Sequence, residues 1–232
     1  SIKESVPAPV ALIVSFPSNP TAQVVSLEFY EELVKIASKY GVYILSDLAY
    51  AEIYYDDVPP PSILQIPKAK EIAVEFTSMS KTYAMAGWRI GFAVGNLKLI
   101  NALTRIKSYL DYGAFTPVQV AAAAALNGPQ DCVLEIRKTY QKRRDTLIKS
   151  MSRSGWDIPS PPASMFAWAP LPQKYKNKGS LEFAKELMLK ADVAVAPGVA
   201  FGEYGEGFVR VGLVENEQRI KQAAKNIKKL LL

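Results

Sequence analysis

The sequence contains no histidine and only one cysteine among its 232 residues. Histidine is the commonest general base and the commonest metal ligand, so its absence shifts any acid–base chemistry to lysine, carboxylate or tyrosine side chains. The single cysteine, Cys132, cannot form an internal disulfide, and its helical surroundings predict a small buried apolar side chain. These absences argue against metal and thiol chemistry and favour a lysine-based site.

Long apolar runs are also absent. No stretch approaches the roughly 18 to 20 residues of a membrane-spanning helix, and the first residues lack a basic segment followed by an apolar one. We therefore expect a cytoplasmic protein without a membrane partner. The net charge is +6, but the basic residues of 136–148 and 219–232 alternate with apolar positions at helical spacing. This pattern is typical of a solvated face, and we expect no nucleic-acid partner.

The first half of the sequence alternates short apolar runs with helical patterns. Ser26 has the character of a helix N-cap, and the helix that follows it is expected to end near Gly41. Strands that are apolar throughout and alternate with helices predict an α/β fold with a mostly parallel sheet that is buried on both faces. Ligands of such sheets bind at the carboxyl ends of the strands. The predicted strands are 9–16, 42–45, 72–76 and 90–94.

The second half predicts helices over 97–110, 118–126 and 130–151, with breaks at Pro117 and at 127–129. Beyond Gly155 the pattern changes, which indicates a smaller α+β domain. Its predicted strands are 165–169, 193–196 and 208–211, and its predicted helices are 181–190 and 219–232. We expect a partial large domain over 1–128, and an interdomain helix with a small C-terminal domain over 129–232.

The segment most informative about chemistry follows the predicted strand 72–76. It reads TSMSKTYAMAGWRIGF over residues 77–92. Two hydroxyls and a guanidinium near the end of a buried strand suit a phosphate, because arginine binds phosphate through paired, charge-assisted hydrogen bonds. A lysine in such a setting can serve as a nucleophilic amine. Taken alone, the lysine could equally be a surface residue in a loop.

This segment resembles the lysine motif of the fold-type I aminotransferases that depend on pyridoxal 5'-phosphate (PLP). That motif consists of S-x-S-K, a spacer and G-x-R-x-G. The resemblance implies that Lys81 is the catalytic residue that forms a Schiff base with PLP. It also implies that Ser78, Ser80 and Arg89 bind the phosphate of the cofactor.

Two further motifs extend the resemblance. Residues 18–22 resemble an N-P-T-G turn whose asparagine, here Asn19, donates a hydrogen bond to the ring oxygen of PLP. Ala22 replaces the usual glycine, which often serves a positive φ. Asp47 and Tyr50 resemble a D-x-x-Y pair, which implies a carboxylate beside the pyridine nitrogen and a phenol beside the ring oxygen. Taken singly, these residues also suit an ordinary turn, a helix cap and a core aromatic.

Arg210 is a charged residue in the otherwise apolar strand 208–211, where an unpaired charge is costly. The resemblance implies that Arg210 binds the α-carboxylate of the substrate through a bidentate contact. It also implies that residues 196–202 line the same site. An internal salt bridge is the alternative.

The stretches 46–54, 85–96 and 105–119 are most similar to bacterial alanine (glutamate-pyruvate) aminotransferases. The resemblance implies transamination between an amino acid, alanine or glutamate, and a 2-oxo acid, by a homodimer. The same core serves aspartate and diaminopimelate aminotransferases, carbon-sulfur lyases, and the effector domains of some transcription regulators. Family members supply further PLP contacts from a segment that precedes the part resembled here. We therefore expect the 232 residues alone to bind PLP poorly.

Overall fold

The computed structural model describes residue 2 and residues 4–231 of the chain. The chain divides into two compact units, which are described separately. Unit 1 comprises residues 1–17 and 24–136, and unit 2 comprises residues 18–23 and 137–232. The division falls within the long helix α6 (Asp131–Ser152). The assignment of residues 1–128 and 129–232 to a large and a small domain stays a prediction.

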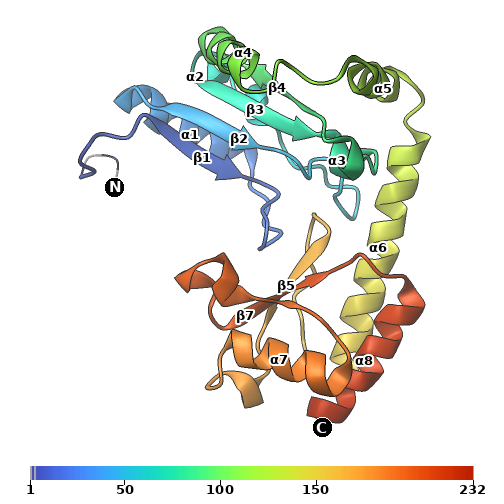
Figure 1. Cartoon of the computed structure of the whole chain (residues 1–232). Coiled ribbons are helices and arrows are strands. Elements are labelled where there is room, and N and C mark those ends of the chain that lie inside the picture. Colours follow the sequence, from blue (N-terminus) through green and yellow to red (C-terminus); the bar gives the residue numbers. More distant parts are fainter. Residues whose placement is uncertain (1, 3, 232) are drawn as a thin grey trace. The chain divides into compact units, whose positions relative to one another are not determined.

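Unit 1 is built on a four-stranded sheet with the order β1-β2-β3-β4 (Figure 1). β2 pairs in parallel with β1 and with β3, whereas β4 runs antiparallel to β3. The prediction of a mostly parallel sheet is therefore confirmed. Its strands are β1 (Ala11–Ser15), β2 (Tyr43–Asp47), β3 (Ala73–Ser78) and β4 (Gly91–Gly95).

Helix α1 (Leu27–Tyr40) connects β1 to β2 and has the predicted caps. The Ser26 hydroxyl accepts a hydrogen bond from the Phe29 amide (3.4 Å), and Gly41 closes the helix in the left-handed conformation. The helix buries an apolar side, including Tyr30 and Val34, in the core that covers one face of the sheet. Local sequence thus fixes the start, the end and the buried side of this helix.

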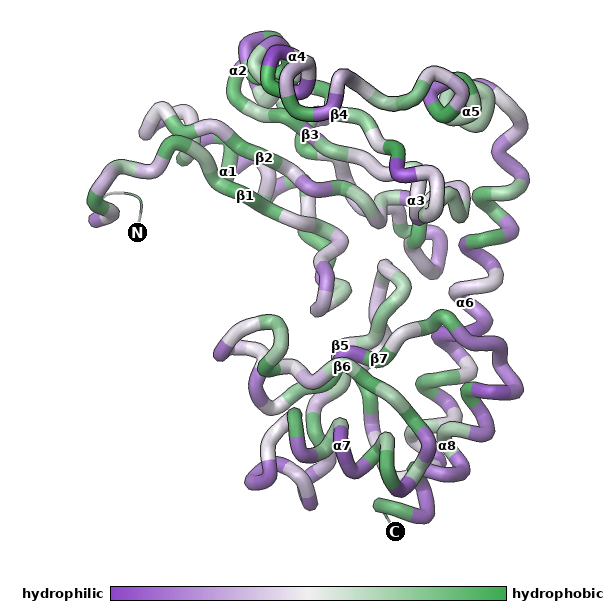
Figure 2. Tube along the Cα trace, viewed as in Figure 1, coloured by the Kyte–Doolittle hydropathy of each residue, from purple (hydrophilic) through white to green (hydrophobic). Residues whose placement is uncertain are grey.

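The prediction that the sheet is buried on both faces is wrong for the two edge strands, β1 and β4. In β4, Phe92 and Val94 are 38% and 43% exposed. Side chains alternate between the two faces of a strand, and Leu12 and Val14 pack on the core that contains α1. Ile13 points to the opposite face and is 78% exposed. β1 is also an edge strand, so Ile13 has a neighbouring strand on one side only. The apolar character of this strand is visible in Figure 2.

The helices that follow β4 begin and end close to the predicted positions. They are α4 (Leu97–Leu110) and α5 (Thr116–Asn127), and Pro117 lies in the first turn of α5. The expectation of a buried cysteine is wrong. Cys132 is exposed in the first turn of α6, where the next residue, Val133, takes the buried position. The sequence patterns did not predict two short helices, α2 (Ala69–Ile72) and α3 (Met79–Thr82).

Unit 2 contains an antiparallel sheet with the order β5-β7-β6, as expected of a small α+β domain. The strands are β5 (Phe166–Pro170), β6 (Ala196–Pro197) and β7 (Phe208–Gly212). β6 is much shorter than the predicted strand 193–196 and begins at its last residue. The helices of this unit besides α6 are α7 (Ser180–Ala191) and α8 (Glu217–Leu231).

The core of unit 2 is rich in aromatic residues. Trp156 and Phe183 are almost completely buried and meet edge to face, with ring centroids 5.3 Å apart. The Trp156 ring nitrogen donates a hydrogen bond to the Pro170 carbonyl (2.8 Å). Among residues 2 and 4–231, no helix is both long and apolar enough to cross a membrane.

Candidate active site

Lys81 lies on α3, immediately after β3 (Figure 1). The hydroxyl of Ser78 caps this short helix by accepting a hydrogen bond from the Ser80 amide (3.2 Å). Lys81 is half-buried, and its Nζ atom lies 5.8 Å from the centroid of the Tyr50 ring. The lysine is therefore held at a strand end against an aromatic side chain, rather than extended on a loop.

Arg89 lies just before β4, which runs antiparallel to β3 and so begins beside the start of α3. The amide of Met79 donates to the carbonyl of Ile90 (3.2 Å), which ties the residue after Arg89 to the start of α3. The exposed Arg89 side chain donates one hydrogen bond, from NH1 to the Ala86 carbonyl (3.0 Å). Its backbone has a φ of +53°, a conformation that is uncommon outside glycine. Ser78, Ser80 and Arg89 are thus brought to one turn.

Gly91 explains why this return is so tight. It pairs with Ser78 in the β3-β4 register, and a Cβ atom at this position would lie 2.5 Å from the Thr77 carbonyl oxygen. Only glycine permits this approach of the two backbones. The second glycine of the G-x-R-x-G motif therefore has a steric reason that is independent of any ligand.

Asp47 ends β2, next to β3 in the sheet. Its Oδ1 atom accepts a hydrogen bond from the Ala49 amide (3.0 Å), and its Oδ2 atom accepts one from the Ser15 hydroxyl (3.4 Å). The carboxylate therefore closes a turn rather than capping a helix. Tyr50 follows in this turn and is 8% exposed, as expected if its side chain is part of the core.

Six of the predicted site residues therefore lie in unit 1, where β2 and β3 end. This is the edge at which parallel sheets bind ligands. Their chemistry fits PLP, because a carboxylate, an amine, hydroxyls and a guanidinium match a pyridine nitrogen, an aldehyde and a phosphate. The individual roles stay predictions. The six residues are Asp47, Tyr50, Ser78, Ser80, Lys81 and Arg89.

The other two predicted site residues, Asn19 and Arg210, meet in unit 2. NH1 of Arg210 donates a hydrogen bond to Oδ1 of Asn19 (2.6 Å). Asn19 lies in a turn closed by hydrogen bonds from the Ala22 amide to the Ser18 carbonyl (2.9 Å) and from the Ser18 amide to the Gln23 carbonyl (3.0 Å). Ala22 has a φ of +57°, so this position does require the conformation for which the family motif uses glycine.

Two aromatic residues lie beside Arg210. Phe201 belongs to the stretch 196–202 that was expected near this residue, whereas Phe166 had not been predicted. The centroids of the Phe166 and Phe201 rings lie 4.4 Å and 4.8 Å from its guanidinium carbon. Within the part of the chain that the structure describes, no carboxylate pairs with Arg210, which contradicts the internal salt bridge. The sequence did contain a pattern that could have indicated Phe166. Phe166 and Trp168 are two residues apart in the predicted strand 165–169, so they lie on one face of the strand that pairs with β7.

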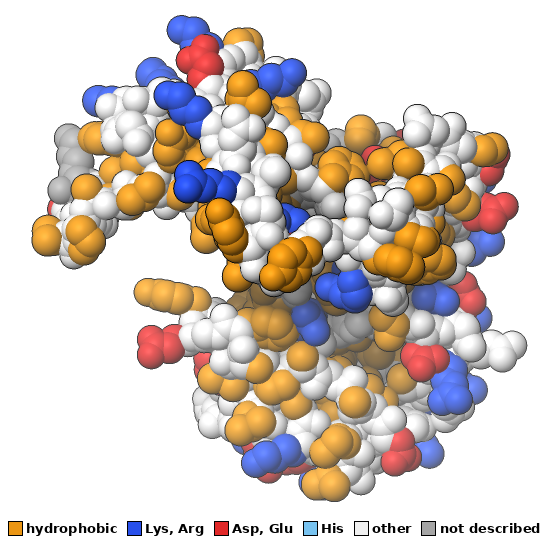
Figure 3. All heavy atoms as spheres, turned by 45° about the horizontal axis from the view of Figure 1, so that its top comes forward, with side chains coloured by type: hydrophobic (Ala, Val, Ile, Leu, Met, Phe, Trp, Pro, Cys, Tyr) orange, Lys and Arg blue, Asp and Glu red, His pale blue; other side chains and the backbone are white. Residues whose placement is uncertain are grey.

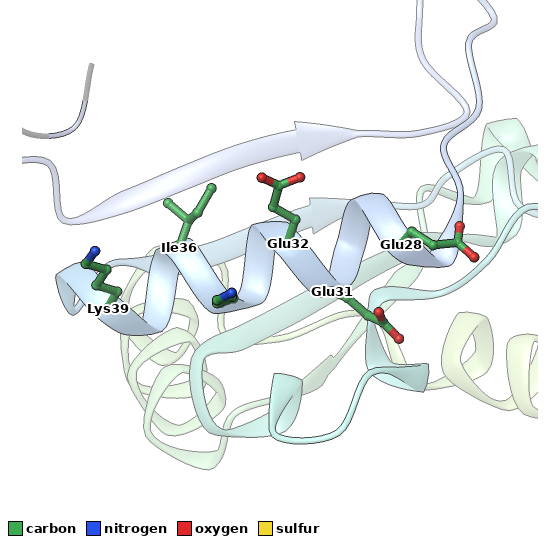
Figure 4. Close-up of a pocket in the computed structure, with 6 residues that line it drawn as sticks. Glu28, Glu31, Glu32, Ile36 and Lys39 are labelled. Atoms are coloured by element: carbon green, nitrogen blue, oxygen red, sulfur yellow. The ribbon is translucent and has the colours of Figure 1, made fainter.

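A separate hollow of about 510 Å³ lies along α1 (Figure 4). All the side chains that line it come from this one helix, and they include Glu28, Glu31, Glu32 and Lys39. The carboxylates lie toward the start of the helix and Lys39 lies in its last turn, an order that complements the helix dipole. This hollow contains none of the predicted site residues and has the character of a solvated helix surface.

The family model described as aminotransferase class I and II matches residues 1–227. The chain belongs to this family. It is 55% identical over 228 residues to the glutamate-pyruvate aminotransferase AlaC of Escherichia coli, covering 98% of this chain and 55% of AlaC. It is 42% identical over 220 residues to an LL-diaminopimelate aminotransferase of Moorella thermoacetica, covering 95% of this chain and 56% of that relative.

Solved aminotransferase structures share the fold. The aromatic aminotransferase of Pyrococcus horikoshii matches with a TM-score of 0.89 and 30% identity, over 95% of this chain and 59% of that one. The predicted family and the α/β fold are therefore confirmed. PLP is the cofactor of this family, as the lysine motif implied. The aminotransferase chain spans a little more than half the length of the curated relatives that it matches.

Proposed function

We propose that the full-length protein catalyses PLP-dependent transamination between alanine or glutamate and a 2-oxo acid. The observation that supports this most directly is the turn after β3, where Lys81 lies against Tyr50 and beside the residues that suit a phosphate. The higher identity to a glutamate-pyruvate aminotransferase than to a diaminopimelate aminotransferase, 55% against 42%, favours alanine and glutamate as substrates.

In this proposal the residues of unit 1 hold the cofactor and move the proton. PLP supplies an electron sink for the bonds at the α-carbon of the substrate. Lys81 would bind the aldehyde of PLP through Nζ and, once displaced by the substrate, would carry a proton to and from that α-carbon. Asp47 places a negative charge at the pyridine nitrogen and keeps it protonated. Ser78, Ser80 and Arg89 bind the phosphate.

The two site residues of unit 2 have a different task. Arg210 binds the α-carboxylate that every amino acid and 2-oxo acid substrate carries, through paired N–H groups of its guanidinium. The Oδ1 atom of Asn19 accepts a hydrogen bond from Arg210, and its side-chain nitrogen would donate one to the ring oxygen of PLP.

Spectra of the full-length protein loaded with PLP would test this function. We expect alanine and glutamate to convert the cofactor band to that of the aminated cofactor, and pyruvate or 2-oxoglutarate to reverse the change. LL-diaminopimelate, aspartate and cystathionine serve as comparison substrates. A faster conversion by one of these three would contradict the proposed substrates. The absence of reversal by any 2-oxo acid would contradict transamination itself and favour a lyase or a ligand-sensing domain.

The proposal also includes a homodimer, as in the resembled family. Large apolar side chains are exposed on α4 and in the segment after it, and Figure 3 shows such side chains on the surface. Patches of this kind mark interfaces more often than solvated surface. They include Ile106, Tyr109, Leu110, Tyr112 and Phe115. Sedimentation of the full-length protein as a dimer, and of its Leu110→Glu variant as a monomer, is the expected result.

A cytoplasmic location completes the proposal and follows the expectation from the sequence, which has no long apolar run. Fractionation of cells that produce the full-length protein checks it. Recovery in a membrane or secreted fraction would contradict it.

A further inference from the structure

We propose that Phe166 and Phe201 form an aromatic clamp that fixes the guanidinium of Arg210 for the α-carboxylate of the substrate. The inference deepens the proposed function and rests on it. A cation is attracted to the face of an aromatic ring within about 6 Å of the centroid. Arg210 meets two such rings, at 4.4 Å and 4.8 Å.

The clamp addresses the flexibility of the arginine side chain. An arginine has many rotamers, and ordering them on binding costs affinity. Two rings and the hydrogen bond to Asn19 Oδ1 together restrict the guanidinium before any substrate arrives. One of the five guanidinium N–H donors faces Asn19, and the remaining donors are available for a carboxylate. The rings contribute no competing acceptor.

The segment that carries Phe201 is itself firmly held. Gly198 and Gly205 approach so closely that a Cβ atom on Gly198 would lie 1.9 Å from the Gly205 carbonyl oxygen. The Val199 amide donates to the Ser180 hydroxyl (3.2 Å), which in turn donates to Glu206 (3.0 Å). Phe201 is thus carried by a closed loop rather than by a free one.

A third aromatic residue supports the position of Phe201. Trp168 lies opposite Arg210 in the β5-β7 register, and its ring meets that of Phe201 edge to face at 5.8 Å. On its other side Trp168 stacks on Phe208 at 5.3 Å. Phe208 therefore belongs to the same aromatic group, but the rings that contact the guanidinium among the described residues are those of Phe166 and Phe201. Phe208 offers a matched control.

The clamp acts on Arg210 and not on the substrate side chain, so its loss should affect all substrates alike. We expect Phe201→Leu to lower kcat/KM by about 3- to 30-fold for alanine, glutamate, pyruvate and 2-oxoglutarate, mainly through KM. Phe201→Tyr keeps the ring and should restore the wild-type values. Phe166→Leu, which removes the other ring, should cause the same uniform loss, and Phe208→Leu should change kcat/KM by less than about twofold.

The experiment uses the full-length enzyme loaded with PLP and includes a binding measurement without turnover. 2-Methylalanine keeps the α-carboxylate but has no α-proton to lose, and calorimetry gives its Kd. We expect Phe201→Leu to raise this Kd by the same factor as KM. Thermal unfolding and the cofactor absorbance should stay at their wild-type values, because Phe201 is 38% exposed and belongs to unit 2.

Several outcomes would overturn the clamp. These are wild-type kinetics in Phe201→Leu, a loss confined to substrates with one kind of side chain, or an equal loss in Phe201→Tyr or Phe208→Leu. A wild-type enzyme without transaminase activity would overturn the proposed function instead. An active wild type with an unaffected Phe201→Leu variant would overturn the clamp alone.

Discussion

The two units of this chain hold their predicted site residues in different ways. In unit 1, Lys81 and Asp47 lie at the ends of neighbouring parallel strands, on short turns fixed by backbone hydrogen bonds. In unit 2, Arg210 lies in the middle of an antiparallel strand, and its guanidinium contacts two aromatic rings. Strand ends can present several unlike groups to one ligand, whereas a strand interior whose charged side chain contacts two rings restricts the orientation of that one group.

The hydrophobic cores of the two units also differ in their composition. Unit 1 contains a carboxylate, Glu75, that is 5% exposed and accepts hydrogen bonds from the Ser62 hydroxyl (2.9 Å) and the Ile63 amide (3.2 Å). The hydroxyl of Tyr30 is also buried there, without a hydrogen-bond partner among the described residues. The core of unit 2 is dominated by rings such as Trp156 and Phe183. The two cores therefore offer different tests of stability, a buried polar group in unit 1 and a buried ring in unit 2.

The largest expected effect tests unit 1. Lys81→Ala in the full-length enzyme should lower kcat by about 100- to 10,000-fold, because no amine remains to accept the proton from the α-carbon of the substrate. Steady-state kinetics with alanine and 2-oxoglutarate measure it. Lys70→Ala, at an exposed lysine on α2, is the matched control and should keep the wild-type kcat. Full activity of Lys81→Ala would refute the assignment of this lysine.

Arg210→Lys tests unit 2 against unit 1. A lysine keeps the charge but loses the paired geometry, so we expect kcat/KM to fall by about 10- to 100-fold for amino acids and 2-oxo acids alike. The loss should lie mainly in KM, unlike that of Lys81→Ala. An Arg210→Lys variant with an unchanged KM and a reduced kcat would contradict the expected difference, in which unit 2 affects substrate affinity and unit 1 affects turnover.

The contrast between the cores predicts two different stability changes. Phe183→Ala should lower the free energy of unfolding by about 3 to 5 kcal/mol, because a fully buried ring is lost from the core of unit 2. Tyr30→Phe removes a buried hydroxyl of unit 1 that has no hydrogen-bond partner among the described residues, and should change the free energy of unfolding by less than about 1 kcal/mol. Urea denaturation measures both. An equal loss of unfolding free energy in Phe183→Ala and Tyr30→Phe would contradict the proposed difference between the two cores.

The smallest expected effect concerns pH. Hydrogen bonds from Lys178, Lys190 and Tyr175 lower the pKa of Glu186 in unit 2 to about 2. The stability from this group is present above its ordinary pKa of 4.5 and is lost as the pH falls towards 2. Glu75 behaves in the opposite sense. Burial raises its pKa above 4.5, so the folded state gains stability as the pH falls towards 4.5.

Unfolding of the wild type, Glu75→Gln and Glu186→Gln between pH 7 and pH 3 would separate these contributions. Glu186→Gln should be less sensitive to acid than the wild type. Glu75→Gln should lose the gain on acidification. A Glu75→Gln variant with the pH dependence of the wild type would show that the buried carboxylate does not titrate in this window.

Local sequence was sufficient where a feature depends on a few neighbouring residues. The Ser26 and Gly41 caps of α1 and the bounds of α4 follow from side chains within one turn. The same is true of the Lys81 motif, whose tight turn needs Gly91 at a fixed spacing. It was not sufficient for Ile13 and Cys132, because apolar character does not say which face of a strand or helix another element covers.

The sequence by itself thus determined the family, the mostly parallel sheet and the residues that meet at the turn after β3. The resemblance placed residues 196–202 near Arg210, but only the tertiary structure decided which rings contact its guanidinium. Phe166 faces it through the pairing of β5 with β7, and Phe201 reaches it from a loop closed by Gly198 and Gly205. The physical reason is that strand register and loop closure depend on contacts between residues far apart in the chain, which no local pattern contains.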